Sequence, residues 1–383
     1  MKDYNGFKIS LHKSGLFRGC VTVDGRQIDR YGRTEREVTE KLKKLREEAI
    51  RGNTIPKKQR LENAMHSYLF DVKQKSVKAS SFDRAECTFN NQIRGTALGR
   101  KVLDGVKEQD LQRHLNELTQ THSISTTKKV YHLLGEFFRF MVATKQLNHN
   151  PMTLVSMPHA SQFRKQPKPM SILSPDEMTR VIQAAESVGA NGEPVYRYGE
   201  AVVLLLLTGL RSGEVRALRD RDVDFSNNML HVETGISHHK DRVNGGVIDE
   251  VSTPKTVRSK RDIPLSSRAV TAIQRLFART YNADSGLLIT TQSGGILSAS
   301  YFQSQYDSIL KRAGIEHKGM HSTRHSCATV LLKHTDAEKK GLIKEVAEIL
   351  GNTIPVCYDF YIGTSNEDKR EMVSVLDDLS KVR

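Results

Sequence analysis

Four short motifs in the C-terminal half of the sequence contain the residue types that phosphoryl chemistry requires. Their central residues, in chain order, are Arg211, Lys255, the pair His321 and Arg324, and Tyr361. An arginine guanidinium binds phosphate oxygens through paired hydrogen bonds. A tyrosine hydroxyl can attack a phosphorus atom when a base or nearby cations activate it. These residue types therefore indicate a site that acts on a phosphate.

The first motif also has a purely structural explanation. It follows the apolar run 201–207, and Gly209 is expected to end the helix that this run forms. Arg211 then emerges at the edge of a buried segment, where a guanidinium without an anionic partner is costly. Glu214 could be that partner, which would give Arg211 a structural role.

The other motifs allow similar alternatives. A turn at about 257–260 between two short strands would put Lys255 near a hairpin tip, where lysines are usually solvated. On a helix that continues from the H-S-T-R-H motif, His321 and Arg324 share one face because they are three residues apart. Tyr361 lies near the end of the chain, where a tyrosine ordinarily packs against a core.

In this order and spacing the motifs resemble the tyrosine recombinase family, which includes phage integrases, conjugative-transposon integrases and chromosome-dimer resolvases. The family pattern is an arginine in T-G-x-R-x-x-E, a lysine on a β-hairpin, H-x-x-R-H, and L-G-H or L-G-W followed by a tyrosine. The resemblance covers about 174–363. The matching residues are Arg211, Glu214, Lys255, His321, Arg324, His325 and Tyr361. Asn352 departs from the pattern, because it stands where the family usually has His or Trp.

The resemblance implies an enzyme that cleaves and rejoins DNA strands through a 3′-phosphotyrosine on Tyr361. Arg211 and Arg324 would stabilise the charge that develops on the non-bridging phosphate oxygens. His321 would act as the base, and Lys255 would protonate the leaving 5′-oxygen as general acid. The interpretation as a site-specific recombinase therefore gives each of these side chains a separate catalytic task.

Three further residues have supporting positions in this interpretation. Glu214 would orient His321, His325 would support the site, and Asn352 could donate a hydrogen bond to the phosphate but cannot become positively charged. We expect no metal and no other cofactor. No Asp and Glu cluster suited to two metal ions accompanies the motifs, and a phosphotyrosine retains the energy of the cleaved bond.

Composition favours the same class of partner. The chain has 383 residues, and its 59 Lys and Arg against 44 Asp and Glu give a net charge of +15, which attracts phosphate backbones. No apolar run approaches the roughly 18 residues that a membrane span needs. The four cysteines are widely spaced, and the N-terminus lacks the apolar stretch of a signal peptide. We expect a cytoplasmic, bacterial nucleoid-associated protein with reduced thiols.

The length and patterning predict a multidomain protein, mainly α with small β elements. Residues 1–58 are expected to form a three-stranded sheet at about 7–11, 17–23 and 27–31, followed by a helix at 34–49. This module resembles an arm-type DNA-binding domain, and residues 1–60 hold 16 Lys and Arg against 8 Asp and Glu. A solvated appendage is the alternative.

Residues 59–158 are expected to form a helical domain. Helices are predicted near 61–75, 80–93 and 108–119, and one apolar helix face is formed by Val130, Leu133, Leu134, Phe137, Phe138 and Met141. Its architecture resembles the SAM-like core-binding domain of the family. The basic stretch 151–169 carries four prolines and shows no periodicity, so an extended linker is expected there. In the predicted domain division the linker is placed at 159–171.

Residues 172–383 are predicted to form a mixed α+β catalytic domain. Its helix start at Ser174 has capping-box spacing with Glu177. An amphipathic tail helix is expected at 372–379. In the family such a tail packs onto a neighbouring protomer, although it could fold back on its own domain.

The expected partners are double-stranded DNA, at core sites and arm sites, and three further copies in a homotetramer with exchange of the C-terminal tail. DNA-bending and excision factors are further candidate partners, and no membrane partner is expected. Two alternatives remain: a catalytically silent DNA-binding regulator on the same scaffold, and strand cleavage of the type IB topoisomerase kind.

Overall fold

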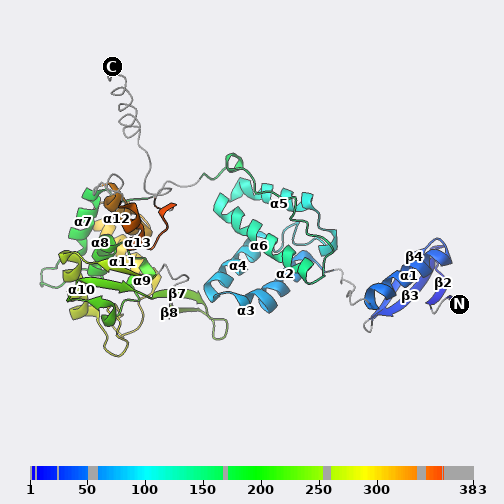
Figure 1. Cartoon of the computed structure of the whole chain (residues 1–383), viewed down its shortest axis with the longest axis horizontal. Helices are drawn as coiled ribbons and strands as arrows, with labels where there is room; N and C mark the ends of the chain where they lie inside the picture. The colour runs from blue at the N-terminus through cyan, green and yellow to red at the C-terminus, as the bar shows by residue number, and fades with distance from the viewer. Residues whose placement is uncertain are drawn as a thin grey trace, which may run out of the picture. The chain divides into compact units, whose positions relative to one another are not determined.

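The structure, a computed structural model, describes residues 2–4, 7–23, 26–50, 59–166, 171–252, 260–333, 342–355 and 357 (Figure 1). The chain divides into two compact units, Met1–Lys168 and Pro169–Arg383. The division lies inside the predicted linker 159–171. Lys255, Tyr358, Tyr361 and the predicted tail helix at 372–379 lie outside the described residues.

The N-terminal part is an antiparallel sheet covered by one helix. Its strands, paired in chain order, are β1 (Lys2–Tyr4), β2 (Phe7–Leu11), β3 (Phe17–Val23) and β4 (Arg26–Gly32), and the helix is α1 (Glu35–Ile50). Three of the strands were predicted, whereas the three-residue strand β1 was not, because so short a segment carries no alternation. A small apolar core joins sheet and helix and consists of Phe7, Ile9, Val38, Leu42 and Leu45.

The rest of the first unit is helical. Its elements are α2 (Leu61–Ser67), the π-helix η1 (Tyr68–Lys73), α3 (Gln74–Ser76), α4 (Ala79–Gln92), η2 (Leu103–Gly105), α5 (Glu108–Thr121), α6 (Ile124–Ala143) and η3 (Ala160–Gln162). The predicted apolar face of α6 is confirmed, since all six of its residues are buried. The predicted helix at 61–75 contains a π-helical segment in its middle, which periodicity alone does not reveal.

The proline-containing segment after α6 packs on the helices as far as residue 166. Met152, Val155 and Phe163 are buried. The backbone N–H of Arg164 donates to the Thr119 carbonyl at 3.1 Å. The sequence predicts an extended linker here because the apolar residues are too widely spaced to give a periodic pattern. In the structure, three isolated apolar side chains suffice to fix the segment.

The second unit surrounds a helix that is buried on all sides. α8 (Gly199–Thr208) is apolar throughout its middle and packs against α7 (Pro175–Ala185), α10 (Ser267–Thr280), α11 (Ala299–Arg312) and α12 (His321–Lys333). The predicted helix start is confirmed, because the Glu177 N–H donates to Ser174 Oγ at 3.1 Å and the Ser174 N–H donates to Glu177 Oε2 at 2.8 Å. The remaining helices are α9 (Ser212–Val215), η4 (Asp220–Asp222) and α13 (Ile343–Leu350).

Two small sheets complete the second unit. One has the strand order β5 (Val223–Asp224), β6 (Met229–Val232) and β9 (Arg261–Pro264), and the other is the hairpin β7 (Gly235–Lys240) and β8 (Val247–Ser252). Lys255 falls between the end of β8 and the start of β9. Among the described residues, no helix combines the length and apolar composition needed to cross a bilayer.

Gly209 provides a sharp test of the packing around α8. It ends this helix with φ +64°, and a Cβ there would lie 2.7 Å from Leu350 Cδ2, whereas Gly314, with φ +67°, has only Arg180 Nη1 at 3.7 Å. The left-handed backbone costs an alanine about 1–2 kcal/mol at either position. Gly209→Ala should lose a further 1–3 kcal/mol, roughly, because the added methyl overpacks the site. Calorimetric unfolding of both variants measures this difference, and equal losses would contradict the packing.

Candidate active site

Arg211 and Glu214 form a closed pair at the start of α9. The Arg211 N–H donates to Glu214 Oε2 at 2.8 Å, and Arg211 Nη1 donates to Glu214 Oε1 at 2.7 Å. Glu214 is therefore a structural partner of Arg211, as the alternative explanation of the first motif expects. The Arg211 side chain nevertheless remains 39% exposed, so its guanidinium is still accessible to a ligand.

A second arginine, Arg261, binds the same carboxylate. Its Nη1 and Nη2 donate to Glu214 Oε1 and Oε2 at 3.0 and 2.8 Å, and its Nε donates to the Ile349 carbonyl at 2.8 Å. Only 4% of its side chain is exposed. Arg261 directly follows the predicted turn at 257–260, and no role was predicted for it. In β9, Arg261 and Ile263 are buried, whereas Asp262 and Pro264 are exposed. This alternation is the signal from which the burial of Arg261 could have been predicted.

The charge of Glu214 follows from this double pairing. Burial would raise the pKa of its carboxyl, but the hydrogen bonds and charge of Arg261, followed by those of Arg211, lower the pKa to about 2. Glu214 is consequently ionised at every pH at which the protein is expected to work.

The guanidinium of Arg324, on α12, is buried behind this pair. Arg324 is 2% exposed, and it donates to the carbonyls of Gly209, at 2.7 Å, and of Leu350. Gly351 ends α13 with φ +61°, and its carbonyl accepts from Arg211 Nη2 at 3.4 Å. The backbone at 350–351 thus receives hydrogen bonds from both arginines of the predicted site.

Asn352 completes this arrangement. Its Oδ1 accepts a hydrogen bond from Arg324 Nη2 at 2.8 Å. With the oxygen engaged in this way, the amide NH₂ is the group that remains to donate. A hollow of about 640 Å³ opens beside it, between β9 and α13, and Lys260 and Lys344 are among its lining residues.

The two histidines of α12 lie edge to face. Their ring centroids are 4.5 Å apart, with the planes at 85°. Partial desolvation, and then the positive charges of Arg324 and Arg211, lower the pKa of His321. Desolvation, the neighbouring ring and Arg324 lower the pKa of His325 to about 4. Both rings are therefore neutral near pH 7, and a neutral imidazole can accept a proton.

The structure brings six predicted site residues into one region, through α9, α12 and the segment after α13. They are Arg211, Glu214, His321, Arg324, His325 and Asn352. Glu214 contacts two arginines by hydrogen bonds, and its influence on His321 is electrostatic, raising the pKa of that ring. Among the described residues there is no group of three His, Cys, Asp or Glu side chains suited to a metal ion.

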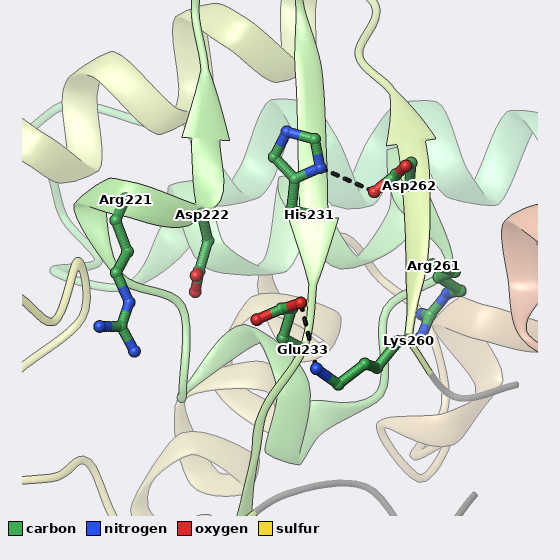
Figure 2. Close-up of a pocket in the computed structure, with 7 residues that line it drawn as sticks. All are labelled: Arg221, Asp222, His231, Glu233, Lys260, Arg261 and Asp262. Atoms are coloured by element: carbon green, nitrogen blue, oxygen red, sulfur yellow. Dashed lines mark hydrogen bonds and ion pairs between the residues drawn. The ribbon is translucent and has the colours of Figure 1, made fainter. Parts of the chain in front are cut away.

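A second hollow, of about 410 Å³, is also lined by Arg261 (Figure 2). Its wall carries alternating charges: His231 Nδ1 lies 2.7 Å from Asp262 Oδ1, and Lys260 Nζ lies 3.2 Å from Glu233 Oε1. Arg221 and Asp222 line the opposite side. This hollow shares Lys260, Arg261 and Asp262 with the hollow beside Asn352.

Comparisons with known proteins agree with the geometry. Residues 171–351 match the model of the phage integrase family. A tyrosine recombinase XerC-like protein of Caldanaerobacter subterraneus subsp. tengcongensis is 27% identical over 97% of this chain and 99% of its own length. The integrase of Staphylococcus phage L54a is 24% identical over 72% of this chain and 81% of its own length.

Two solved structures share the fold. The Tn1549 transposon integrase in complex with transposon right end DNA has a TM-score of 0.66 and 19% identity, and the match covers 83% of this chain and 100% of that one. A lambda integrase dimer bound to a COC′ core site has a TM-score of 0.54 and 15% identity, over 92% of this chain and 94% of that one.

The histidines give a test of the local electrostatics. An NMR titration of the imidazole signals should find His325 with a midpoint at about 4, and His321 below the ordinary value of 6.5. His231 is an internal control, because its hydrogen bond to Asp262 raises the pKa. Since unfolded His325 takes up a proton near pH 6.5 and the folded residue does not, it should reduce stability as the pH falls from 6.5 toward 4. A His325 midpoint near 6.5 would refute the described environment.

Proposed function

We propose that the chain, whose residues 171–351 match the model of the phage integrase family, is a site-specific DNA recombinase. It cleaves and rejoins DNA strands through a 3′-phosphotyrosine on Tyr361 and thereby integrates or excises a mobile element. The observation that carries this proposal is the convergence of Arg211 and Arg324 on the segment 350–352, where they bind the Leu350 and Gly351 carbonyls and the Asn352 side chain.

The chemistry follows from the charge that a phosphodiester develops during displacement. Tyr361 Oη forms a bond to the phosphorus atom, and the bond from phosphorus to the 5′-oxygen breaks. Arg211 and Arg324 donate hydrogen bonds to the non-bridging oxygens, where negative charge accumulates. The hydrogen bonds of Arg324 to the Gly209 and Leu350 carbonyls and to Asn352 Oδ1 orient its guanidinium.

Proton transfer is assigned to two other residues. His321, whose lowered pKa keeps the ring neutral, accepts the proton of the Tyr361 hydroxyl. Lys255 donates a proton to the departing 5′-oxygen. Rejoining is the reverse: a 5′-hydroxyl attacks the phosphotyrosine, and Tyr361 leaves and recovers its proton. His325 packs against His321 and restricts the orientation of its ring.

Asn352 is proposed to contribute one hydrogen bond to the same phosphate. Because Arg324 binds its Oδ1, the amide NH₂ is available for a non-bridging oxygen. An amide adds no positive charge, so this position contributes less than a protonatable side chain would.

The proposed substrate is double-stranded DNA, bound at core sites by the helical part of the chain and the second unit. The net charge of +15 supports salt-sensitive binding. The sheet formed by β2, β3 and β4, with α1, is proposed to bind separate arm sites. Four copies assemble on DNA, with the residues after Gly363 packed onto a neighbouring copy. DNA-bending and excision factors assist the reaction.

Covalent trapping tests the enzymatic proposal. The probe is a pool of nicked duplexes with randomised sequence around the nick, so that cleavage releases a short strand and traps the adduct. The wild-type chain should form a covalent adduct, which denaturing gels detect and sequencing of the attached DNA identifies. Tyr361→Phe should form none, whereas the control Tyr358→Phe should retain it.

Two results would count against this mechanism. An adduct that persists in Tyr361→Phe would place the nucleophile elsewhere, and DNA binding without any wild-type adduct would favour a regulator.

EDTA should leave the adduct yield within about twofold, since two guanidinium groups supply the charge stabilisation that a metal ion would otherwise give.

Removal of the C-terminal tail tests the proposed assembly. Deletion of the residues after Gly363 should reduce tetramer formation on the selected DNA, because each copy loses an apolar surface that its neighbour covers. Sedimentation of the protein–DNA complex measures the assembly. A truncated chain that still forms the tetramer in full would show that the tail does not link the copies.

A further inference from the structure

We infer that Arg261 is a positioning residue for the proposed strand cleavage: it holds the Glu214 carboxylate in the one orientation that fixes the guanidinium of Arg211. The inference rests on the proposed function and adds to it a residue that none of the four motifs contains. Arg261 acts through Glu214.

The hydrogen bonds show how the orientation is set. Glu214 Oε1 accepts from Arg211 Nη1 at 2.7 Å and from Arg261 Nη1 at 3.0 Å. Glu214 Oε2 accepts from the Arg211 N–H at 2.8 Å and from Arg261 Nη2 at 2.8 Å. Each carboxylate oxygen therefore has one donor from each arginine, and rotation of the carboxylate would break bonds to both.

A further contact of Arg261 reaches the end of α13. Its Nε donates to the Ile349 carbonyl at 2.8 Å. A Cβ on Gly351 would lie 3.1 Å from Arg261 Cδ, so the two segments are in close contact. Arg324 is held by Leu350 and Asn352 in this same segment. Arg261 thus connects the part of the site that holds Arg211 with the part that holds Arg324.

Arg216 shows that burial of an arginine does not by itself create this connection. It is 3% exposed, and it donates to the carbonyls of Leu297, at 2.6 Å, and of Ser212, at 3.2 Å. These are neutral backbone acceptors rather than the carboxylate. Arg216 is therefore a matched control: its loss removes a buried guanidinium from the same unit and leaves the Glu214 pairing in place.

The pH dependence separates positioning from simple stabilisation. Charged and titratable groups from three elements act on Glu214: Arg211 from α9, Arg261 from β9, and His321 from α12. β7, which packs against α9 at Gly213, presents the Ile236 backbone there. Without Arg261, burial would raise the pKa of Glu214, and a protonated Glu214 could no longer accept from both donors of Arg211. Cleavage should then weaken as the pH falls.

The experiment measures the rate of adduct formation by the full chain at saturating concentrations of the nicked duplex that the trapping selects. The pH is varied from about 8 to about 5.5, a range in which an exposed glutamate stays ionised. Affinity for the same duplex is measured in parallel. Arg261→Met, Arg261→Lys, Glu214→Gln, the double variant of Arg261→Met with Glu214→Gln, and the control Arg216→Met are compared with the wild type.

Arg261→Met should lower the cleavage rate at pH 8 by about tenfold or more, with DNA affinity largely retained. Complete removal of a charge-stabilising donor costs about 100-fold or more, and here Arg211 is displaced but still present. The deficit of Arg261→Met should grow as the pH falls. A glutamine at position 214 cannot be protonated in this pH range. The deficit of Glu214→Gln alone, and that of the double variant, should therefore not grow as the pH falls. Arg261→Lys should fall between, because its charge is kept and the two-pronged geometry is lost.

Three results would overturn the inference. The first is a wild-type rate and pH profile in Arg261→Met. The second is a pH profile of Arg261→Met that matches that of Arg216→Met, since this would leave Arg261 only a stabilising role. If Arg261→Met does not fold, Arg261→Lys becomes the deciding variant. The third result is then a wild-type cleavage rate and pH profile in Arg261→Lys. Absence of any wild-type adduct would instead refute the proposed function, and the inference with it.

Discussion

The arrangement of the candidate active site depends on one buried carboxylate shared by two arginines. Glu214 would be costly to bury alone, and so would the guanidinium of Arg261. Paired with each other and with Arg211, the groups satisfy their hydrogen bonds, and the carboxyl pKa falls to about 2. The ion pairs constrain geometry more than they stabilise the fold, because desolvation offsets much of their attraction. Arg211 remains partly exposed and keeps a defined orientation.

The second constraint is the approach of three chain segments around the other arginine. Gly209 ends α8 and Gly351 ends α13, each with a left-handed backbone. Their positions bring carbonyl oxygens from both helix ends to Arg324. Uncharged carbonyl acceptors orient a guanidinium without cancelling its positive charge. The site thus holds one arginine through a carboxylate and the other through helix ends, which is suited to binding two faces of a phosphate.

Much of this arrangement could be predicted from the sequence, because the residues that carry it are in motifs of recognisable spacing. The helix ends at Gly209 and Gly351, the pairing of Arg211 with Glu214, and the shared face of His321 and Arg324 all follow from local rules. Arg261 was missed because its partner is 47 residues away in the sequence and no local rule pairs them. The packing of 151–166 was missed for a related reason: isolated apolar residues have no period, and only the three-dimensional fold supplies their neighbours. The catalytic roles of Lys255, Tyr361 and the other predicted site residues remain predictions.

A carbon-13 titration of the glutamate side chains in the full chain would test the central role of the shared carboxylate most directly. At pH 4.5, the ordinary midpoint of a glutamate carboxyl, an unperturbed glutamate is about half protonated. Glu214 should then still be ionised, and the carbon-13 chemical shift of its carboxyl group should be unchanged from its value at pH 7. A Glu214 signal that titrates together with the exposed glutamates would contradict the account, because the two arginines would not be holding the charge.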